Sequence, residues 1–204
     1  MSPSDNAGLR KSLTAAAIIL ALVGVGLIAY PFATDLWAAR IQSGLSGDLD
    51  ANESDYKLGR VKSGDPLTRL EIPKLDVDVI VVEGTSLAAL RAGAGHYPKT
   101  ALPGLPGNVG IAGHRTTFGR PFNRIDELKP GDRVILTTPI GRHVYEVIQL
   151  PRVVVPLDWS VIDDYPKKGS FLTLTSCHPE GSDDYRISVR AKLIESSGSA
   201  AEAA

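Results

Sequence analysis

The longest uncharged stretch of the chain limits where this protein can reside. Residues 13–33, LTAAAIILALVGVGLIAYPFA, carry no charged side chain. A helix rises about 1.5 Å per residue, so this stretch would span roughly 30 Å, the thickness of a bilayer core. It therefore predicts a transmembrane anchor over residues 13–34, preceded by a short tail, residues 1–12.

The charges beside this stretch predict its orientation. Arg10 and Lys11 precede it, and only Arg40 lies close behind. Because positive residues stay in the cytoplasm, we expect a single-pass cell-membrane protein with a cytoplasmic N-terminus and an extracytoplasmic bulk. The alternative is a cleaved signal peptide, whose apolar region runs about 7–15 residues and ends at an A-x-A-like site. The greater length here, and an exit at residues 30–33 that matches such a site poorly, favour the uncleaved anchor.

The composition of the chain excludes several function classes. The 22 basic residues are balanced by 23 acidic ones, so the basic excess of a nucleic-acid-binding protein is absent from the sequence. One cysteine and four scattered histidines lack the spacing of a zinc site. We therefore predict no nucleic-acid partner and no metal site.

The rest of the chain consists of short apolar runs separated by glycine and proline, which is typical of an all-β domain. The expected strands cover residues 67–72, 77–82, 108–113, 132–138, 143–150, 153–155, 171–177 and 185–194. Short helical turns are expected at residues 86–92, 122–128 and 159–165. Eight or so strands with few helices predict a mainly β fold, a barrel or a sandwich.

This pattern also divides the chain. Residues 35–64 mix a brief helical pattern with Gly, Ser and Asp, and we interpret them as a stalk between membrane and domain. The folded domain is expected over residues 65–195. Residues 196–204 are small and polar, which predicts a disordered tail.

The only cysteine of the sequence stands at the end of an expected strand. Residues 171–177 alternate up to Cys177, and a polar turn, residues 178–184, follows. A lone cysteine is often a small buried hydrophobe. A thiol that opens into a loop, however, is placed for reaction rather than for packing, so Cys177 is a candidate nucleophile.

An arginine lies near the start of the returning strand, nine positions later. If residues 171–177 and 185–194 form an antiparallel hairpin, Arg186 and Cys177 lie near each other. A guanidinium beside a thiol favours the thiolate and can stabilise an oxyanion. The alternative is a solvated arginine paired with Asp183 or Asp184.

Four histidines compete for the role of proton partner. His114 ends a short apolar run closed by glycine, and an imidazole beside a thiol can take its proton. His178 adjoins the cysteine, but strand neighbours point to opposite faces. His143 is expected in solvent within a hairpin, and His96 is expected to hydrogen-bond backbone in a loop. The residues favour His114 by a narrow margin.

Several motifs in a fixed order resemble the sortase family of cysteine transpeptidases over residues 65–194, most closely its class E and also its class D. Residues 173–177, TLTSC, are similar to the family's TLxTC strand, and Arg186 follows at the position of the family's arginine. Residues 107–115, GNVGIAGHR, look like the strand that bears the family's histidine. Residues 119–132 then follow in the manner of class D and E enzymes.

This resemblance implies an eight-stranded sortase β-barrel behind one transmembrane helix. It also implies Cys177 as nucleophile, His114 as proton donor and acceptor, and Arg186 as the cation that stabilises the oxyanion. Thr175 and Ser176 are expected to bind substrate, although Ser176 stands where the family usually has Thr, which keeps the hydroxyl and removes a methyl group. The resemblance implies no metal or organic cofactor.

The implied reaction is cleavage of an LPxTG- or LAxTG-like sorting signal between Thr and Gly through a thioacyl intermediate. The acyl group would then pass to the amine of a peptidoglycan precursor or of a pilin, so exported proteins that carry such a signal are the expected partners. One alternative is a membrane-tethered cysteine endopeptidase that gives the acyl group to water. The other is a non-catalytic β-domain that binds the cell wall.

Overall fold

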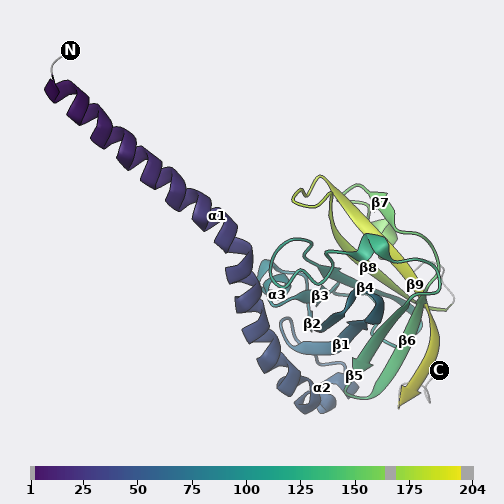
Figure 1. The fold of residues 1–204 in the computed structure, drawn as a ribbon. Coiled ribbons are helices and arrows are strands. Elements are labelled where there is room, and N and C mark those ends of the chain that lie inside the picture. Colours follow the sequence, from purple (N-terminus) through teal and green to yellow (C-terminus); the bar gives the residue numbers. More distant parts are fainter. Residues whose placement is uncertain (1–2, 164–168, 199–204) are drawn as a thin grey trace.

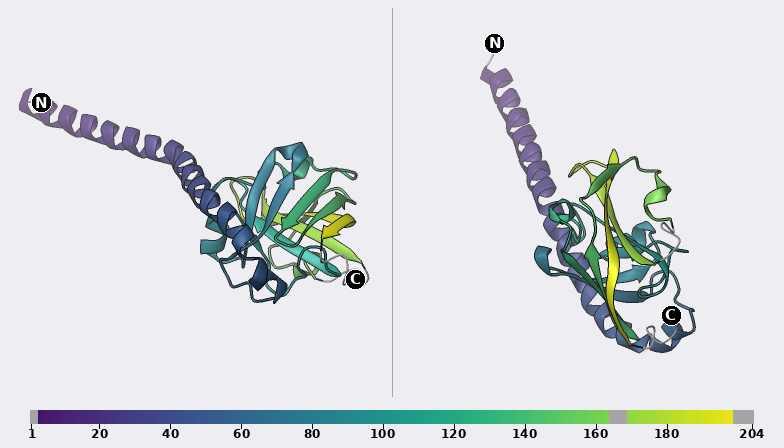
Figure 2. Two further views of the ribbon diagram at one scale, coloured as in Figure 1. Left: turned by 90° about the horizontal axis from the view of Figure 1, so that it is seen from below. Right: turned by 90° about the vertical axis from the view of Figure 1, so that its right-hand side faces the viewer.

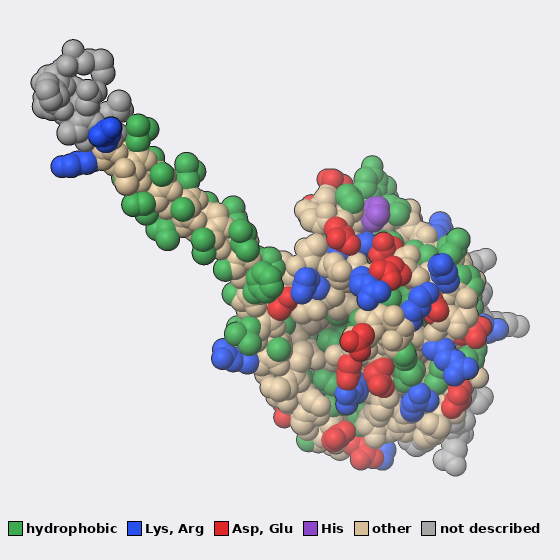
Figure 3. Space-filling view, viewed as in Figure 1, with side chains coloured by type: hydrophobic (Ala, Val, Ile, Leu, Met, Phe, Trp, Pro, Cys, Tyr) green, Lys and Arg blue, Asp and Glu red, His purple; other side chains and the backbone are tan. Residues whose placement is uncertain are grey.

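A long helix precedes the β-domain in the computed structural model, which describes residues 3–163 and 169–198. Helix α1 covers Pro3–Ala51. From residue 10 onward it is long and apolar enough to cross a membrane, and its most apolar window has a mean hydropathy of 2.4 and no burial against protein. Figure 3 shows hydrophobic side chains around this part of the helix. α1 contains Pro31, and proline is a residue that kinks helices. The helix bends as it reaches the domain (Figure 1).

The second half of α1 packs against the β-domain (Figure 2). Ala38 and Leu49 are buried on its inner face. The Gln42 amide donates to the carbonyl oxygens of Ile80 and Ala92 at 3.0 and 2.6 Å and accepts from the Ile80 N–H at 2.6 Å. Much of the segment interpreted as a stalk is therefore a docked helix, followed by the short helix α2, Glu53–Lys57.

Eight strands close the barrel. In chain order the strands are β1 Pro66–Ile72, β2 Val77–Glu83, β3 Ala94–His96, β4 Gly107–Gly113, β5 Arg133–Thr138, β6 Gly141–Val147, β7 Arg152–Val154, β8 Ser170–His178 and β9 Tyr185–Gly198. Their order is β6-β5-β1-β2-β3-β4-β8-β9-β7, and β6 also pairs with β9. This last pairing joins the ends of the ring and leaves β7 beside it, which confirms the predicted eight-stranded barrel.

Short helices fill the connections. They are η1 Pro73–Leu75, α3 Leu87–Arg91, η2 Ile125–Glu127 and η3 Trp159–Val161. Ser86 caps α3, because its side chain accepts from the Ala89 N–H at 3.2 Å. The turn predicted over residues 159–165 begins with η3, and residues 164 and 165 lie outside the described residues.

The interior of the barrel is filled by alternate residues of the ring strands. Fully buried examples come from four strands: Leu70, Ile72, Ile111, Leu136, Leu172 and Leu174. Burying each such side chain stabilises the fold by roughly 1.5–3 kcal/mol. Strand β3 escaped the sequence prediction because its three residues are too few to show an alternation.

Strand β9 is longer than predicted and covers a residue that was expected in solvent. Residues 196–198 pair with residues 141–143 of β6, so the start of the predicted disordered tail is strand, while residues 199–204 lie outside the described residues. His143 is completely buried under this pairing, and its Nδ1 lies 2.9 Å from the Ser196 hydroxyl. The expectation of a solvated His143 was wrong, because Ser196 and the backbone at Gly104, both distant in sequence, pack against its ring.

Candidate active site

Three adjacent strands bring the predicted site residues to one end of the barrel. β4 runs parallel to β8, with Ala112 opposite Thr175 as the last pair. His114 and Cys177 each lie two residues beyond that pair. On the other side of β8, β9 is antiparallel and sets Arg186 opposite Cys177. The cysteine strand therefore lies between the histidine strand and the arginine strand.

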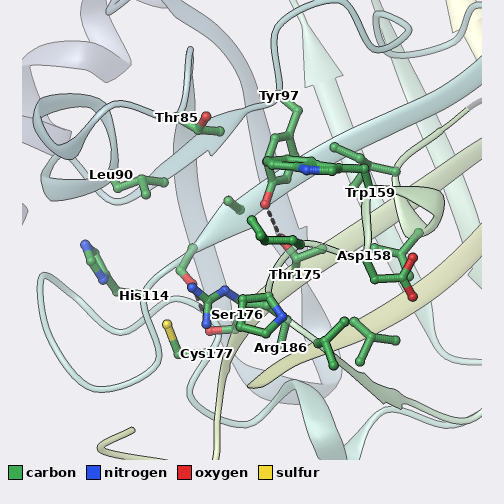
Figure 4. A pocket seen from close by; sticks show the side chains of 18 residues that line it. Thr85, Leu90, Tyr97, His114, Asp158, Trp159, Thr175, Ser176, Cys177 and Arg186 are labelled. Carbon is green, nitrogen blue, oxygen red and sulfur yellow. Dashed lines mark hydrogen bonds between the residues drawn. The ribbon is translucent and has the colours of Figure 1, made fainter. Parts of the chain in front are cut away.

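Cys177 and Arg186 are both accessible from the pocket at this end (Figure 4). Cys177 is a half-exposed free thiol. Nη1 of Arg186 donates to the carbonyl oxygens of Asp183 and Tyr185 at 2.8 and 2.9 Å. Among the described residues the guanidinium forms no ion pair with Asp183 or Asp184, so it is held by backbone and keeps its positive charge uncompensated beside the thiol.

His114 lies close to the thiol in Figure 4. Its Nε2 is buried and has no hydrogen-bond partner within the described part of the chain. Burial lowers the pKa of the imidazole, and the positive charge of Arg91 lowers it further. The neutral imidazole, which can accept a proton from a thiol or an amine, is therefore favoured at neutral pH.

Packing and backbone hydrogen bonds fix the position of His114. A Cβ at Gly113 would lie 2.6 Å from the Phe122 ring, so only glycine allows this close approach. The hydroxyl of Ser176 donates to the Gly113 carbonyl at 2.8 Å, and the Phe122 N–H donates to the His114 carbonyl at 3.2 Å. These contacts hold the end of β4 against both β8 and the following loop.

Arg115 connects the loop that follows His114 to the strand that carries Cys177. The sequence analysis did not single it out. Its side chain is 4% exposed and donates to the Asn123 carbonyl at 2.9 Å and to the Asp126 carboxylate at 2.8 Å. It also reaches the Cys177 carbonyl at 3.5 Å. A buried charge is stable only when it is paired, so these contacts keep Arg115 in place. The sequence signal for this structural role was an arginine directly after the predicted histidine.

His114, Cys177 and Arg186 line a cavity of about 350 Å³. Thr175 and Ser176 also line it, but the Ser176 hydroxyl already donates to Gly113, whereas Thr175 Oγ1 lies 3.0 Å from the hydroxyl of Tyr97. Tyr97 is a lining residue that sequence reasoning missed. Its lone aromatic ring in a Gly- and Pro-rich segment carried no spacing signal.

One wall of the cavity is apolar and comes from the segment after β7. Val155, Leu157 and Trp159 are exposed there, and the Trp159 ring meets Tyr97 edge to face at 6.3 Å. Exposed apolar side chains beside a cavity mark a binding surface. This wall is therefore a candidate binding surface beside the thiol.

The other histidines lie outside the lining of this cavity. His178 is paired with Tyr185 in the β8–β9 ladder. His96 ends strand β3 instead of lying in a loop as expected; it is buried, with the expected backbone contact of Nε2 to the Ala101 carbonyl at 3.1 Å and with Nδ1 2.7 Å from the Glu83 carboxylate. Of the four histidines, only His114 is among the described residues that line the cavity. Across the described residues no cluster of three or more His, Cys, Asp or Glu side chains could hold a metal ion.

Comparisons with known proteins agree with this arrangement. Residues 70–194 match the family model of the sortase domain. Sortase SrtE1 of Streptomyces coelicolor is 39% identical over 150 residues, which are 67% of this chain and 43% of that protein. Sortase D of Bacillus subtilis is 34% identical over 66% of this chain and 64% of its own length. The chain thus spans about half the length of the curated relatives it matches.

Solved structures show the same fold. A sortase D5 transpeptidase of Clostridium perfringens superposes with a TM-score of 0.68 at 29% identity, over 76% of this chain and 99% of its own. Sortase E1 of Streptomyces coelicolor, solved with a tripeptide in the active site, gives 0.62 at 39% identity, over 65% of this chain and 90% of its own. Together with the match over residues 70–194, these likenesses show that the chain belongs to the sortase family.

Proposed function

We propose that this protein is a membrane-anchored cysteine transpeptidase that cleaves an LPxTG- or LAxTG-like sorting signal between Thr and Gly. The observation that carries the proposal is the position of Cys177 on β8, between β4, which ends just before His114, and β9, which begins just before Arg186. A nucleophile, a base and a fixed cation around one cavity are the parts that acyl transfer requires.

In the first half of the reaction the Cys177 thiol gives its proton to the neutral His114 imidazole, and the resulting thiolate attacks the carbonyl carbon of the Thr residue. The oxygen becomes an anion, which the Arg186 guanidinium stabilises. The C–N bond to Gly then breaks, His114 gives its proton to the departing amine, and a thioester remains on Cys177. Because Nη1 of Arg186 is held by Asp183 and Tyr185, the cation needs little reorganisation when the charge develops.

In the second half an amine attacks the thioester. His114, now neutral, accepts a proton from the incoming nitrogen, the C–S bond breaks, and the thiolate is restored as a new amide forms. The lowered pKa of His114 supports this step, because a neutral imidazole is the acceptor that it needs. The amine belongs to a peptidoglycan precursor or to a pilin.

The apolar wall and the hydroxyl groups of Tyr97 and Thr175 support a peptide substrate. The structure of Streptomyces coelicolor sortase E1 was solved with a tripeptide in its active site, which supports peptide binding in the same cavity. Exported proteins with a sorting signal are the proposed partners. Thr175 is the proposed polar contact for the peptide, and Ser176 contributes through the backbone that it holds.

The apolar helix supports the proposed location. α1 crosses the cell membrane over residues 13–34 in this proposal, with residues 1–12 in the cytoplasm and the barrel outside. Arg10 and Lys11 before the apolar stretch favour this orientation. The orientation can be tested in cells by cysteine labelling or fusion reporters that show on which side of the membrane each end of the chain lies. An extracytoplasmic N-terminus would refute it.

The reaction can be tested with the full chain in detergent micelles. We expect LPxTG or LAxTG peptides to form a mass adduct on Cys177 and to release the fragment that begins with Gly. An added amine should then appear in a new amide at Thr, and Cys177→Ala should abolish both products. Release of a free Thr carboxylate at the same rate with and without amines would instead indicate a hydrolase. Binding without cleavage would indicate the non-catalytic alternative.

A further inference from the structure

The loop that follows His114 has an unusual backbone. Phe118, Gly119 and Arg120 are consecutive and all have positive φ, at 53°, 77° and 46°. A bulky residue such as Phe rarely adopts this conformation, which persists only where the surroundings hold it in place. Besides backbone hydrogen bonds within the loop, contacts from α1 hold it in place.

Two neighbouring residues of α1 bind these three loop residues. The Thr34 hydroxyl accepts from the Phe118 N–H at 3.4 Å. The Asp35 carboxylate accepts from the Gly119 N–H at 2.9 Å and forms an ion pair with Arg120 at 2.9 Å. A stretch of backbone that is unfavourable by itself is thus fixed by the helix just beyond its apolar part.

The Phe118 ring then connects the helix to the imidazole. It meets Trp37 of α1 edge to face at 5.9 Å, and it lies 5.2 Å from the His114 ring at an angle of 39°. The Arg91 guanidinium lies 5.7 Å from the same Phe118 ring. A continuous row of side chains therefore runs from the helix to His114.

We propose that Trp37 and Asp35 of α1 are positioning residues that hold Phe118 against His114, so that docking of the membrane helix sets the geometry of the histidine. The proposal rests on the proposed function, because it is the role of His114 in proton transfer that makes its position important. Beyond that function, the proposal gives the part of α1 that follows the membrane span a role in catalysis in addition to anchoring.

The charged groups near His114 come from several elements. Cys177 and Arg186 face it from β8 and β9, and Arg91 acts on it from α3. Beyond Phe118, the Asp35–Arg120 pair brings one charge of each sign. Displacement of Phe118 from the ring of His114 therefore hydrates the imidazole and also removes the ring over which the Arg91 guanidinium lies.

The test uses the full chain in detergent micelles, with Trp37→Ala and Asp35→Ala as the disruptive variants. Trp37→Phe keeps an aromatic edge on Phe118. Asp35→Asn keeps the acceptor for the Gly119 N–H and loses only the ion pair with Arg120, so its effects should be smaller than those of Asp35→Ala. Glu127→Gln is the matched control, since it breaks the exposed ion pair with Arg124, 2.7 Å long, which lies on the next segment of the chain.

Three readouts separate positioning from stability. We expect NMR titration to show the pKa of His114 rising in Trp37→Ala and Asp35→Ala as the ring becomes hydrated. We expect the kcat for peptide transfer to fall by about tenfold with KM little changed, as for a misplaced reacting group. The rate of Cys177 alkylation by iodoacetamide at a fixed pH should fall, because a displaced His114 is no longer placed to take the proton of the thiol. Trp37→Phe and Glu127→Gln should follow the wild type in all three.

An unchanged His114 titration and an unchanged kcat in both disruptive variants would overturn the proposal, as would equal effects in Glu127→Gln. The titration and the alkylation need no sorting peptide. They therefore decide the role of α1 even if no peptide is ever transferred, which would count against the proposed function alone.

Discussion

Cys177 and Arg186 lie directly opposite each other on the antiparallel strands β8 and β9. Because neighbouring residues of this ladder are fixed by backbone hydrogen bonds, the thiol and the guanidinium keep one relative position. Nη1 of Arg186 is further held by the carbonyl oxygens of Asp183 and Tyr185. The cation is thus preorganised beside the sulfur before any substrate arrives.

Removal of this cation should slow the chemical step without unfolding the barrel. We expect Arg186→Ala to lower kcat by about 10²–10³-fold, the effect of losing one oxyanion donor, with a small change in KM. Steady-state kinetics with a sorting peptide measure this, and circular dichroism checks the fold. A variant with a near-wild-type kcat would remove Arg186 from the proposed mechanism.

The contrast between the two sides of β8 explains how far the sequence could predict the site. The β8–β9 contact is local, so an alternating pattern interrupted by a polar turn was enough to bring Arg186 to Cys177. The β4–β8 contact is parallel and joins residues 63 positions apart, such as Gly113 and Ser176. No local pattern specifies such a pairing, so only family resemblance could select His114 firmly from four histidines.

The same distinction applies to the helix and to β9. Ala38, Gln42, Leu45 and Leu49 recur on one helical face and contact the barrel, which is a signal of packing. Because glycine and serine lie between these positions, the sequence analysis interpreted residues 35–64 as a stalk. Residues 196–198 contribute to the burial of His143 together with Gly104, and their small polar composition gave no indication of strand.

Buried histidines should make the barrel sensitive to acid. Burial lowers the pKa of His143, and burial with Arg91 lowers that of His114, below the ordinary value of about 6.5. Between the folded and unfolded pKa values the unfolded chain binds more protons, so stability is greatest above about pH 6.5 and falls as the pH drops through this window.

We therefore expect the melting temperature in detergent micelles to decrease between pH 7 and pH 5. His143→Asn can keep an acceptor or donor near Ser196 and removes one titrating group, so its melting temperature should depend less on pH. An identical pH dependence in the variant and the wild type would contradict the assignment of the effect to His143.

Ser176 should act through Gly113. Its buried hydroxyl donates to the Gly113 carbonyl at 2.8 Å, so Ser176→Ala leaves a buried acceptor unpaired and should destabilise the fold by about 1–3 kcal/mol. Ser176→Thr retains the hydroxyl and should keep most of the stability. Thermal unfolding of both variants measures the difference, and equal melting temperatures would show that this hydrogen bond contributes little.

The close approach of β4 to the Phe122 ring gives the last prediction. A Cβ on residue 113 would lie 2.6 Å from that ring, so Gly113→Ala should destabilise the fold by about 1–3 kcal/mol through overpacking. Because Gly113 directly precedes His114, the shift should also lower kcat. Phe122→Leu in the same chain makes room for the methyl group, and we expect the double variant to recover kcat more than the sum of the single effects allows. Strictly additive effects in this double-mutant cycle would show that the contact with Phe122 does not set the position of His114.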